Sequence, residues 1–268
     1  MPVHDDLGLR MKEYYEGVPK TRLMRRTPVA IRIDGKAFHT FTRGFEKPFD
    51  MILMRCMQET MQYLCENIQG CVLGYTQSDE ITLILVDYKK LNSSAWFDYE
   101  VQKMCSIASS MATLAFNRSF ALKCAEYKKQ KETEGSAEDK LATIYEKAVQ
   151  MGAMFDARCF NIPKEEVTNL LYWRQLDAAR NSVQMVGQAY FSHKELHGKS
   201  CNMIQEVLWQ EKNINWNDYP TECKRGACCI RMDAAGEERP GWMIDREIPM
   251  FRNADRFYVD ALVYVEEE

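Results

Sequence analysis

The sequence predicts an α+β fold of the ferredoxin-like kind, in which an antiparallel sheet is backed by helices. The first observation is an alternating apolar run at residues 29–34 (VAIRID), typical of a strand, followed by a strongly helical stretch at 50–68. The second is a pair of apolar runs, 71–77 and 81–86, separated by a short polar corner, which predicts a hairpin. The third is a long helical pattern over 97–123. This order of elements fits an antiparallel sheet covered by helices.

Local signals justify the individual elements. Gly35 permits a sharp turn after the first strand, Pro48 and Asp50 indicate the start of a helix, and Gly70 indicates its end. The remaining predicted elements are helices over 6–18, from Pro163 onward and over 200–211, extended segments over 155–162, 226–232 and 257–265, and a solvated helix end or loop over 126–140.

The composition is that of a packed globular chain. Of 268 residues, 46% are hydrophobic and 28% are charged, which excludes disordered and collagen-like proteins. Lys+Arg 35 against Asp+Glu 39 gives a net charge of -4, so the chain does not coat nucleic acid with its whole surface, although a local basic groove remains compatible. The ten cysteines form no C-x-x-C motif and predict buried thiols in a reducing compartment. With no apolar run near the roughly 20 residues of a membrane span, we expect a cytoplasmic protein without membrane association.

Two aspartates are the candidate chemical centre. Asp34 ends the first predicted strand, and Asp79, beside Glu80, stands at the corner of the predicted hairpin. Because the first and third strands of such a layer can pair, these carboxylates are expected to converge on one edge of the sheet. Converging carboxylates share a proton, form ion pairs or bind cations, and hard oxygen ligands suit Mg²⁺. Two Mg²⁺ ions at such a site would support phosphoryl or nucleotidyl transfer.

The neighbourhood of these acids favours phosphate as the ligand. The turn Gly35-Lys36-Ala37-Phe38-His39 can direct backbone N–H groups at an anion. Cations and a hydroxyl able to hold phosphate oxygens lie nearby in the sequence: Arg32, Lys36, Lys47 and Ser78. The alternative is that the Asp-Gly pair is only a turn and Ser78-Asp79-Glu80 only a polar hairpin tip. Spacing alone leaves both interpretations open.

Several motifs in order resemble one family. They are IRIDGKAFHTFTRGFEKPFD (31–50), GYTQSDEITLIL (74–85), Lys103, FDARCFNIP (155–163), WRQLDAARNS (173–182), NINWND (213–218) and KRG (224–226). Together they are similar to the tRNA-His guanylyltransferase family and its Thg1-like relatives, the reverse, 3′-to-5′ nucleotide-adding polymerases. The resemblance runs from about residue 5 to residue 232.

The resemblance implies roles for specific residues. Asp34, Asp79 and Glu80 would be catalytic, and Asp34, Asp79 and the Gly35 carbonyl would hold two Mg²⁺ ions. The loop from Asp34 to His39, with Ser78 and Asp79, would bind the nucleoside triphosphate, ATP or GTP. Arg32, Lys47 and Lys103 match basic positions for handling the triphosphate and activating the RNA 5′ end. The implied organisation is one elaborated domain over 1–268, with a polymerase palm-like core at about 5–140, a C-terminal part at about 150–232 and an extension of open role at 233–268.

The sequence departs from the family at one motif. Members that add the single guanosine to tRNA-His carry HINNLY after an R-Q-x-D element. Here Arg174, Gln175 and Asp177 are present, but Ala178-Ala179-Arg180-Asn181-Ser182 follow, and only Asn181 fits. The resemblance therefore favours the branch that adds templated nucleotides to 5′-truncated tRNA after activation of its 5′ end by ATP or GTP.

Other functions and contacts stay open from the sequence. Alternatives are a tRNA-His guanylyltransferase, a palm-type nucleotidyltransferase that acts without RNA, and a non-catalytic RNA-binding module with a palm-like fold. The expected RNA contacts are Arg174, Asn181, His193, Lys194 and Lys199, with tRNA as the partner. A homotetramer is expected, because family members assemble and one acidic subunit offers limited cationic surface for a tRNA.

Overall fold

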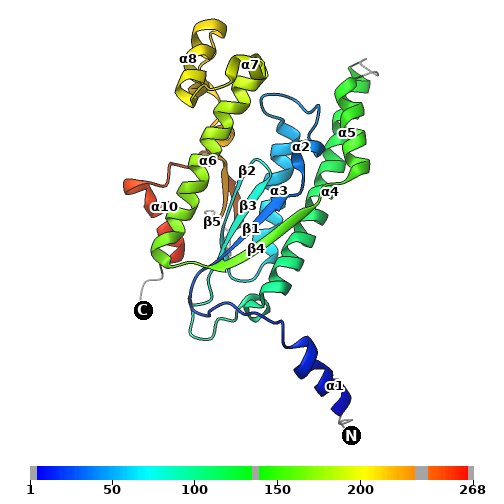
Figure 1. Ribbon diagram of the computed structural model, residues 1–268, viewed down its shortest axis with the longest axis vertical. Helices are drawn as coiled ribbons and strands as arrows, with labels where there is room; N and C mark the ends of the chain where they lie inside the picture. Colours follow the sequence, from blue (N-terminus) through cyan, green and yellow to red (C-terminus); the bar gives the residue numbers. More distant parts are fainter. Residues whose placement is uncertain (1–4, 135–138, 233–240, 265–268) are drawn as a thin grey trace.

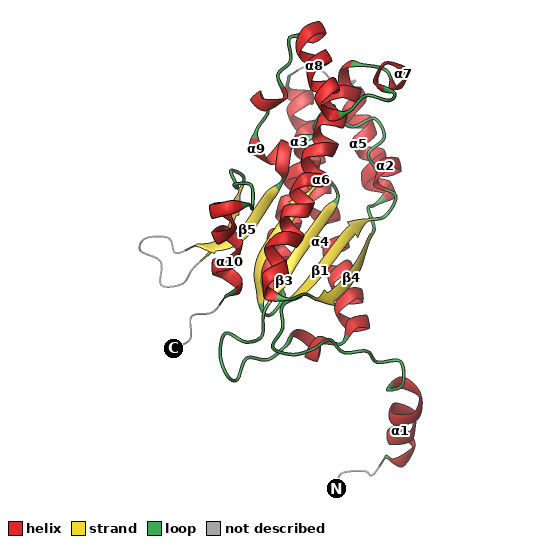
Figure 2. Ribbon diagram, turned by 60° about the vertical axis from the view of Figure 1, so that its left-hand side comes forward, coloured by secondary structure: helices red, strands yellow, loops and turns green. Residues whose placement is uncertain are grey.

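A computed structural model describes residues 5–134, 139–232 and 241–264 of the chain. Its centre is a six-stranded sheet with the order β4-β1-β3-β2-β5-β6, and every neighbouring pair is antiparallel (Figures 1 and 2). The strands are β1 Val29–Gly35, β2 Cys71–Gln77, β3 Glu80–Leu85, β4 Phe155–Asn161, β5 Ala227–Met232 and β6 Gly241–Asp245. The predicted α+β class with an antiparallel sheet is confirmed.

Helices cover both faces of this sheet (Figure 1). The α-helices are α1 Asp6–Met11, α2 Phe38–Phe41, α3 Met51–Asn67, α4 Val101–Thr133, α5 Lys140–Met151, α6 Lys164–Tyr190, α7 His193–Leu196, α8 Cys201–Lys212, α9 Thr221–Arg225 and α10 Phe257–Val263. A π-helical turn, Lys12–Glu16, continues α1, and short 3-10 turns occupy Trp96–Tyr99, Trp216–Asp218 and Asn253–Arg256. Residues of α3 and α4 pack on one face of the sheet, and residues of α6 and α10 pack on the other.

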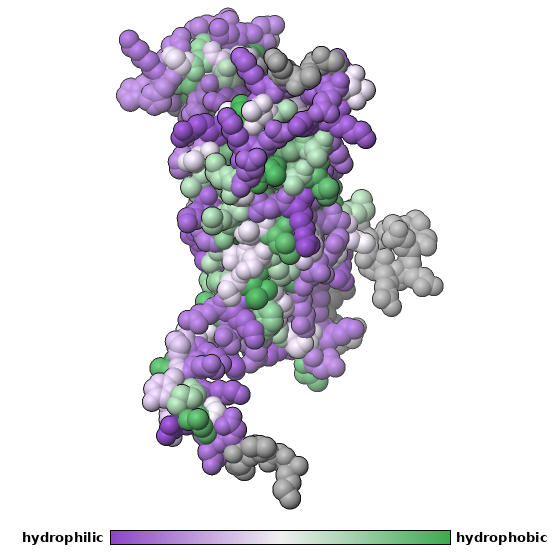
Figure 3. All heavy atoms as spheres, turned by 90° about the vertical axis from the view of Figure 1, so that its right-hand side faces the viewer, coloured by the Kyte–Doolittle hydropathy of each residue, from purple (hydrophilic) through white to green (hydrophobic). Residues whose placement is uncertain are grey.

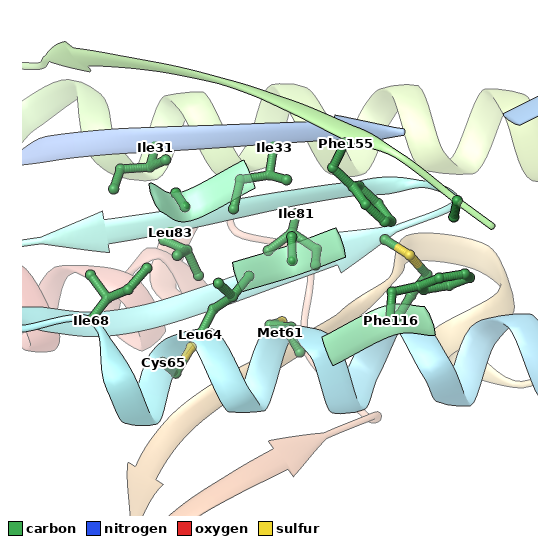
Figure 4. Close-up of a cluster of buried hydrophobic side chains, with 14 of the residues drawn as sticks. Ile31, Ile33, Met61, Leu64, Cys65, Ile68, Ile81, Leu83, Phe116 and Phe155 are labelled. Carbon is green, nitrogen blue, oxygen red and sulfur yellow. The ribbon is translucent and has the colours of Figure 1, made fainter. Parts of the chain in front are cut away.

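The alternation of β1 decides which side chains reach each face. Ile31 and Ile33 are fully buried in the core beneath α3 and α4, beside side chains such as Met61 and Leu64 (Figure 4). Arg32 points to the opposite face, where its guanidinium lies 5.5 Å from the ring centroid of Trp173 on α6. Because side chains alternate along a strand, Asp34 shares the face of Arg32. Arg32 therefore meets α6, and Asp34 lies on the same side of the sheet, away from the main apolar core.

The pairing of the strands brings Asp34 and Asp79 to the same edge of the sheet, as the sequence predicts. Asp34 pairs with Glu80 of β3 on one side and with Asp156 of β4 on the other. Gln77 pairs with Glu80, so β2 and β3 form a hairpin whose turn is Ser78-Asp79. Ser78 has a φ of 51°, the positive value that tight hairpin turns favour. The predicted hairpin, with acidic residues at its tip, is confirmed.

Several boundaries and elements differ from the sequence prediction. Residues 257–265 were expected to be extended, but Phe257–Val263 form α10, because Val259 and Val263, four residues apart, both bury against the sheet. Helix α4 begins at Val101 rather than at residue 97, and it continues to Thr133, so residues 126–133 form its solvated end, one of the two forms predicted for 126–140. Residues 135–138 of that stretch lie outside the described residues. Helix α5 and strand β6 were not predicted. The extension beyond residue 232 thus contributes an edge strand, which pairs with β5.

The described helices are too short or too polar to cross a membrane.

Candidate functional site

The site lies where β1 ends beside the tip of the β2–β3 hairpin. The backbone N–H of Gly35 donates a hydrogen bond to the carbonyl oxygen of Asp79 at 3.0 Å, which ties the hairpin tip to the end of β1. This bond places Asp34 and Asp79 on adjacent backbone segments. The Ser78 hydroxyl donates to Oδ1 of Asp79 at 2.9 Å and orients that carboxylate. The convergence predicted from the sequence is therefore present.

Gly35 is required by close packing. A Cβ atom at this position would lie 2.2 Å from Cδ2 of Phe38, so any larger residue would displace the Phe38 ring. The ring packs within 5.2 Å (centroid to centroid) of Phe155 on β4 and within 5.6 Å of Phe116 on α4. Ala37, with a φ of 55°, then turns the chain into α2. The loop after β1 is thus folded back over the sheet and fixed by aromatic packing.

A cavity of about 470 Å³ opens at this edge of the sheet. Seven of its lining residues are among those predicted to bind nucleotide: Gly35, Ala37, Phe38, His39, Lys47, Ser78 and Asp79. The other lining residues are Thr42, Phe45, Glu46, Pro48, Asp50, Leu53, Met185 and Gln188. The volume is in the range of small-molecule sites in proteins. Residues far apart in the sequence therefore form one ligand-sized space.

The two aspartates lie in an environment that disfavours their charge. Burial, followed by the charges of Asp79, Glu80 and Asp156, raises the pKa of Asp34. Burial also raises the pKa of Asp79, and it outweighs the hydrogen bond from Ser78. Neither carboxylate forms an ion pair with a described residue. Two repelling, unneutralised carboxylates favour a bound cation.

The donor set at this edge fits a hard cation. Asp34, Asp79 and the Gly35 carbonyl would supply oxygen ligands, the type that Mg²⁺ prefers. Within the described ranges no group of three or more His, Cys, Asp or Glu side chains is placed to hold a metal. A magnesium ion here would therefore complete its shell with water and substrate phosphate, as Mg²⁺ commonly does.

Glu80, the third predicted acid, is neutralised by two arginines. Its Oε2 accepts from Arg32 at 2.7 Å, and its Oε1 accepts from Nε of Arg174 at 2.8 Å. Arg174 also donates to Asp177 at 2.8 Å, and Trp173 lies against the guanidinium groups of both arginines. Glu80 and Arg174 are each 6% exposed, so the centre of this network is buried. In this structure Glu80 links the sheet to α6, next to the two aspartates.

The structure does not bring every predicted nucleotide ligand to the cavity. Lys103 is exposed on α4, with its ammonium 5.1 Å from the ring centroid of Phe97. The part of α4 beside the site carries Asn117, which bonds the backbone of Ala153. Lys103 lies fourteen residues earlier, or roughly 20 Å along the helix at about 1.5 Å per residue. Lys36 is exposed at the loop, and Arg32 is engaged by Glu80. Asp34 is half-buried at the end of β1 and is not among the residues that line the cavity.

The predicted RNA contacts divide into one buried and several exposed residues. Arg174 is 6% exposed, and its guanidinium is held between Glu80 and Asp177. Asn181 is exposed and lines a second, smaller cavity of about 80 Å³ that adjoins Ser78 and Met185. His193, Lys194 and Lys199 are exposed or half-buried on and after α7, at the far end of α6 (Figure 1).

Two groups of site residues were missed from the sequence. Met185 and Gln188 of α6 reach the cavity, although nothing in their helical pattern distinguishes them from other surface positions. Asp50 is buried: it accepts from the N–H of Leu53, the N–H of Glu46 and the hydroxyl of Tyr145, and so fixes the loop that carries Lys47. Its position before a helical stretch was a usable signal for a helix cap.

Comparisons with known proteins agree with this geometry. The family model of tRNAHis guanylyltransferase (Thg1) matches residues 9–163. A solved bacterial tRNA(His) guanylyltransferase (Thg1)-like protein in complex with ATP is 39% identical, with a TM-score of 0.80 and coverage of 97% of this chain and 100% of that chain. A bacterial tRNA(His) guanylyltransferase (Thg1)-like protein solved in complex with GTP is 37% identical, with a TM-score of 0.76 and coverage of 97% of this chain and 100% of that chain. An uncharacterized protein of Acanthamoeba polyphaga mimivirus is 30% identical over 239 residues, 84% of this chain and 76% of that protein. The chain therefore belongs to the tRNA-His guanylyltransferase family and is a nucleotidyltransferase.

Proposed function

We propose that the protein adds nucleotides in the 3′-to-5′ direction to the 5′ end of tRNA, directed by the opposite strand as template. The reaction follows activation of the 5′ end by ATP or GTP and repairs 5′-truncated tRNA. One observation carries this proposal: Asp79 lines a ligand-sized cavity, and a second unneutralised carboxylate, Asp34, lies on the adjacent backbone segment. The bacterial Thg1-like relatives, solved with ATP and with GTP, support nucleotides as the ligands.

Asp34, Asp79 and the Gly35 carbonyl would hold two Mg²⁺ ions in this reaction. When bound, the ions activate the attacking oxygen and stabilise the charge that develops on the leaving phosphate. The described residues prepare the site by holding both carboxylates in a half-buried position, where their mutual repulsion favours a cation. The paired Glu80 holds α6 against β1 and β3 and thereby fixes the wall of the site.

The cavity would bind the triphosphate of the incoming nucleotide. Lys47 and the Ser78 hydroxyl can hold phosphate oxygens there, and the first N–H groups of α2 lack partners within the helix. Arg32 and Lys36 lie next to the cavity rather than in its lining. Lys103, by its distance, would contact a triphosphate or RNA 5′ end bound outside this cavity.

The alternative function is addition of the extra 5′ guanosine to tRNA-His. The segment that replaces HINNLY argues against it, because Ala178, Asn181 and Ser182 line only the small second cavity. Ser182 is buried and accepts a hydrogen bond from the Trp216 indole at 3.0 Å, so it is occupied within the protein. A purely RNA-binding role is disfavoured because two unpaired carboxylates would repel RNA phosphates.

The test incubates the protein with labelled tRNA, Mg²⁺ and the four nucleoside triphosphates. The substrates are tRNAs that lack the first nucleotide, with each of the four bases at the opposing position, and full-length tRNA-His. We expect addition of the complementary nucleotide to each truncated tRNA. Addition of guanosine alone, to tRNA-His alone and regardless of the opposing base, would instead establish the guanylyltransferase function. Turnover of nucleotides without RNA would point to a transferase that does not use RNA.

We further propose that the chain forms one elaborated domain and assembles as a homotetramer that contacts tRNA through surface cations such as the exposed Lys194 and the half-buried Lys199. Figure 3 displays apolar side chains among hydrophilic ones over the face that carries α4 and α5, and on the projecting α1. Exposed apolar residues include Leu7, Leu9 and Met11 of α1 and Leu114 and Leu122 of α4. Such surfaces are typical of subunit interfaces. The ten cysteines are all free, which supports a reducing compartment, the cytoplasm.

A further inference from the structure

A second large cavity, of about 440 Å³, lies at the opposite end of the sheet. It is bounded by Gly70 and Cys71 at the start of β2, by Val86 after β3, by Leu262 of α10 and by the loop that begins at Lys89. Cys71 and Gln77 are the two ends of β2, and a strand of that length spans roughly 20 Å. This cavity is therefore separate from the aspartate site.

The charged residues that line this cavity are all cations. They are Lys89, Lys90 and Arg231, and no carboxylate of a residue that the structure describes lines the cavity. None of the three forms an ion pair with a described residue, and the Arg231 guanidinium lies 5.1 Å from the ring centroid of Trp242. Although Lys89 is exposed as a whole residue, burial of its ammonium and the charge of Arg231 lower its pKa. An anion between these groups would relieve that repulsion.

The loop that carries the two lysines is held in place from outside the cavity. Arg26 donates to the carbonyl oxygens of Lys90 and Leu91, and Arg25 donates to the carbonyl oxygen of Ser93. Arg25 is itself fixed by an ion pair with Asp87, which is 1% exposed. On the other side, Gln69 donates to the Ser94 hydroxyl at 2.6 Å. The cationic wall is thus preorganised, which lowers the entropy lost when a ligand binds.

We propose that this cavity binds a phosphate-bearing anion. The three lining cations and the hydroxyls of Ser93 and Ser94 match the oxygens of a phosphate group, and the volume accommodates a nucleotide. The phosphate belongs either to a free nucleotide or polyphosphate, or to the backbone of an RNA chain. The site is independent of the nucleotidyl transfer proposed for the aspartate site, because it shares no residue with it.

The experiment measures equilibrium binding of inorganic tripolyphosphate by calorimetry with EDTA present. Without a metal, the carboxylates of Asp34 and Asp79 repel this anion, so the signal reports the cationic cavity. We compare the wild-type protein with Arg231→Gln and Lys89→Gln, and with Lys129→Gln as the control for removing one exposed cation elsewhere. Thermal unfolding of each variant verifies that it is folded. ATP, and a short single-stranded RNA with a 5′-hydroxyl, then replace tripolyphosphate to distinguish the two sources.

We expect each cavity variant to weaken binding about tenfold, the usual effect of losing one charge-assisted hydrogen bond, and the control to bind like the wild type. If the cavity variants bind tripolyphosphate and ATP more weakly, the ligand is a free nucleotide or polyphosphate. If only their binding of the RNA is weakened, the ligand is a phosphate of the RNA backbone. Binding that is absent for all three probes, unchanged in both cavity variants, or equally weakened in the control overturns the proposal.

Discussion

The carboxylate of Glu80 and the guanidinium of Arg174 meet across the contact between β3 and α6, with Arg174 Nε 2.8 Å from Glu80 Oε1. Both side chains are almost fully buried, and Arg32 completes the pairing on the strand side. Removing one partner of such a pair leaves an uncompensated buried charge, which is much more harmful than losing a surface ion pair. The link therefore stabilises the wall beside Asp34 and Asp79.

The first prediction concerns this link. Arg174→Met should lower the free energy of unfolding by about 3 kcal/mol, the low end for a broken buried pair, because Glu80 would lose its α6 partner and keep only Arg32. Arg180→Met is the control, since Arg180 also pairs with Asp177 on α6 but its side chain is 66% exposed; it should change stability by about 0–1 kcal/mol. Urea unfolding of both variants provides the measurement, and equal effects would contradict a structural role for Arg174.

The second prediction separates catalysis from stability at the aspartates. Asp34→Ala and Asp79→Ala should each lower nucleotide addition by at least about 100-fold, the scale of losing a group that stabilises transition-state charge. Neither change should lower the melting temperature at neutral pH, because the raised pKa of each aspartate means that its ionised form is disfavoured in the folded protein. Asp98→Ala, which removes an exposed carboxylate near the other end of the sheet, serves as the control. Near-normal addition by folded Asp79→Ala would refute the two-metal assignment.

Local sequence patterns were sufficient for most of the sheet. Two patterns are clear signals for strands: the alternation of Ile31 and Ile33, and the apolar runs on both sides of Ser78-Asp79. They are clear because each face of a strand packs against one layer of the fold. The run at 257–263 was ambiguous, because Val259 and Val263 are compatible with both a strand and a helix. Only packing against the sheet selects the helix there.

The pairing of distant charges could not be derived from the sequence. Nothing in the spacing of Arg32, Glu80 and Arg174 reveals that they meet, because the meeting depends on how α6 lies across the sheet. For the same reason Lys103 was expected at the nucleotide, although α4 carries it toward the other end of the sheet. The convergence of Asp34-Gly35 with Ser78-Asp79 could be predicted because the two motifs stand at the ends of strands that pair with each other.

The third prediction concerns stability at acid pH. Burial alone would raise the pKa of Glu222, but hydrogen bonds from Arg55 and Gln58 and the charge of Arg55 outweigh it and lower the pKa. A carboxylate with a lowered pKa stabilises the fold above its unfolded pKa of about 4.3, and this contribution is lost as the pH falls through the folded value. Glu222→Gln should therefore be less stable than the wild type at pH 7, and the difference should shrink below about pH 4.

Urea unfolding of the Glu222 variant and the wild type between neutral and acid pH measures this difference. Glu211→Gln, which changes an exposed glutamate at the end of α8, is the control. A difference that stays constant with pH would show that the Arg55–Glu222 pair does not couple ionisation to folding.

The fourth prediction concerns assembly. Light scattering should give the mass of a tetramer for the full chain. Leu7→Ser and Leu9→Ser, in the exposed α1, should shift the mass toward smaller species while the unfolding temperature of the subunit changes little, because none of the α1 residues is buried within the subunit. Lys129→Gln on α4 is the surface control. A wild-type monomer with full activity would refute the assembly.

The last prediction concerns activation of the RNA 5′ end. A 5′-monophosphate lacks a leaving group for attack by the 3′-hydroxyl of the incoming nucleotide, whereas a 5′-triphosphate releases pyrophosphate. RNA with a 5′-monophosphate should therefore require ATP or GTP before a templated nucleotide is added, and RNA with a 5′-triphosphate should not. The measurement uses 5′-truncated tRNA prepared in both forms, with the templating base chosen so that the incoming nucleotide is neither ATP nor GTP. Because the same two aspartates would act on both RNAs, Asp34→Ala should abolish addition to each of them. Equal dependence of both RNAs on ATP or GTP would contradict the proposed order of activation and addition.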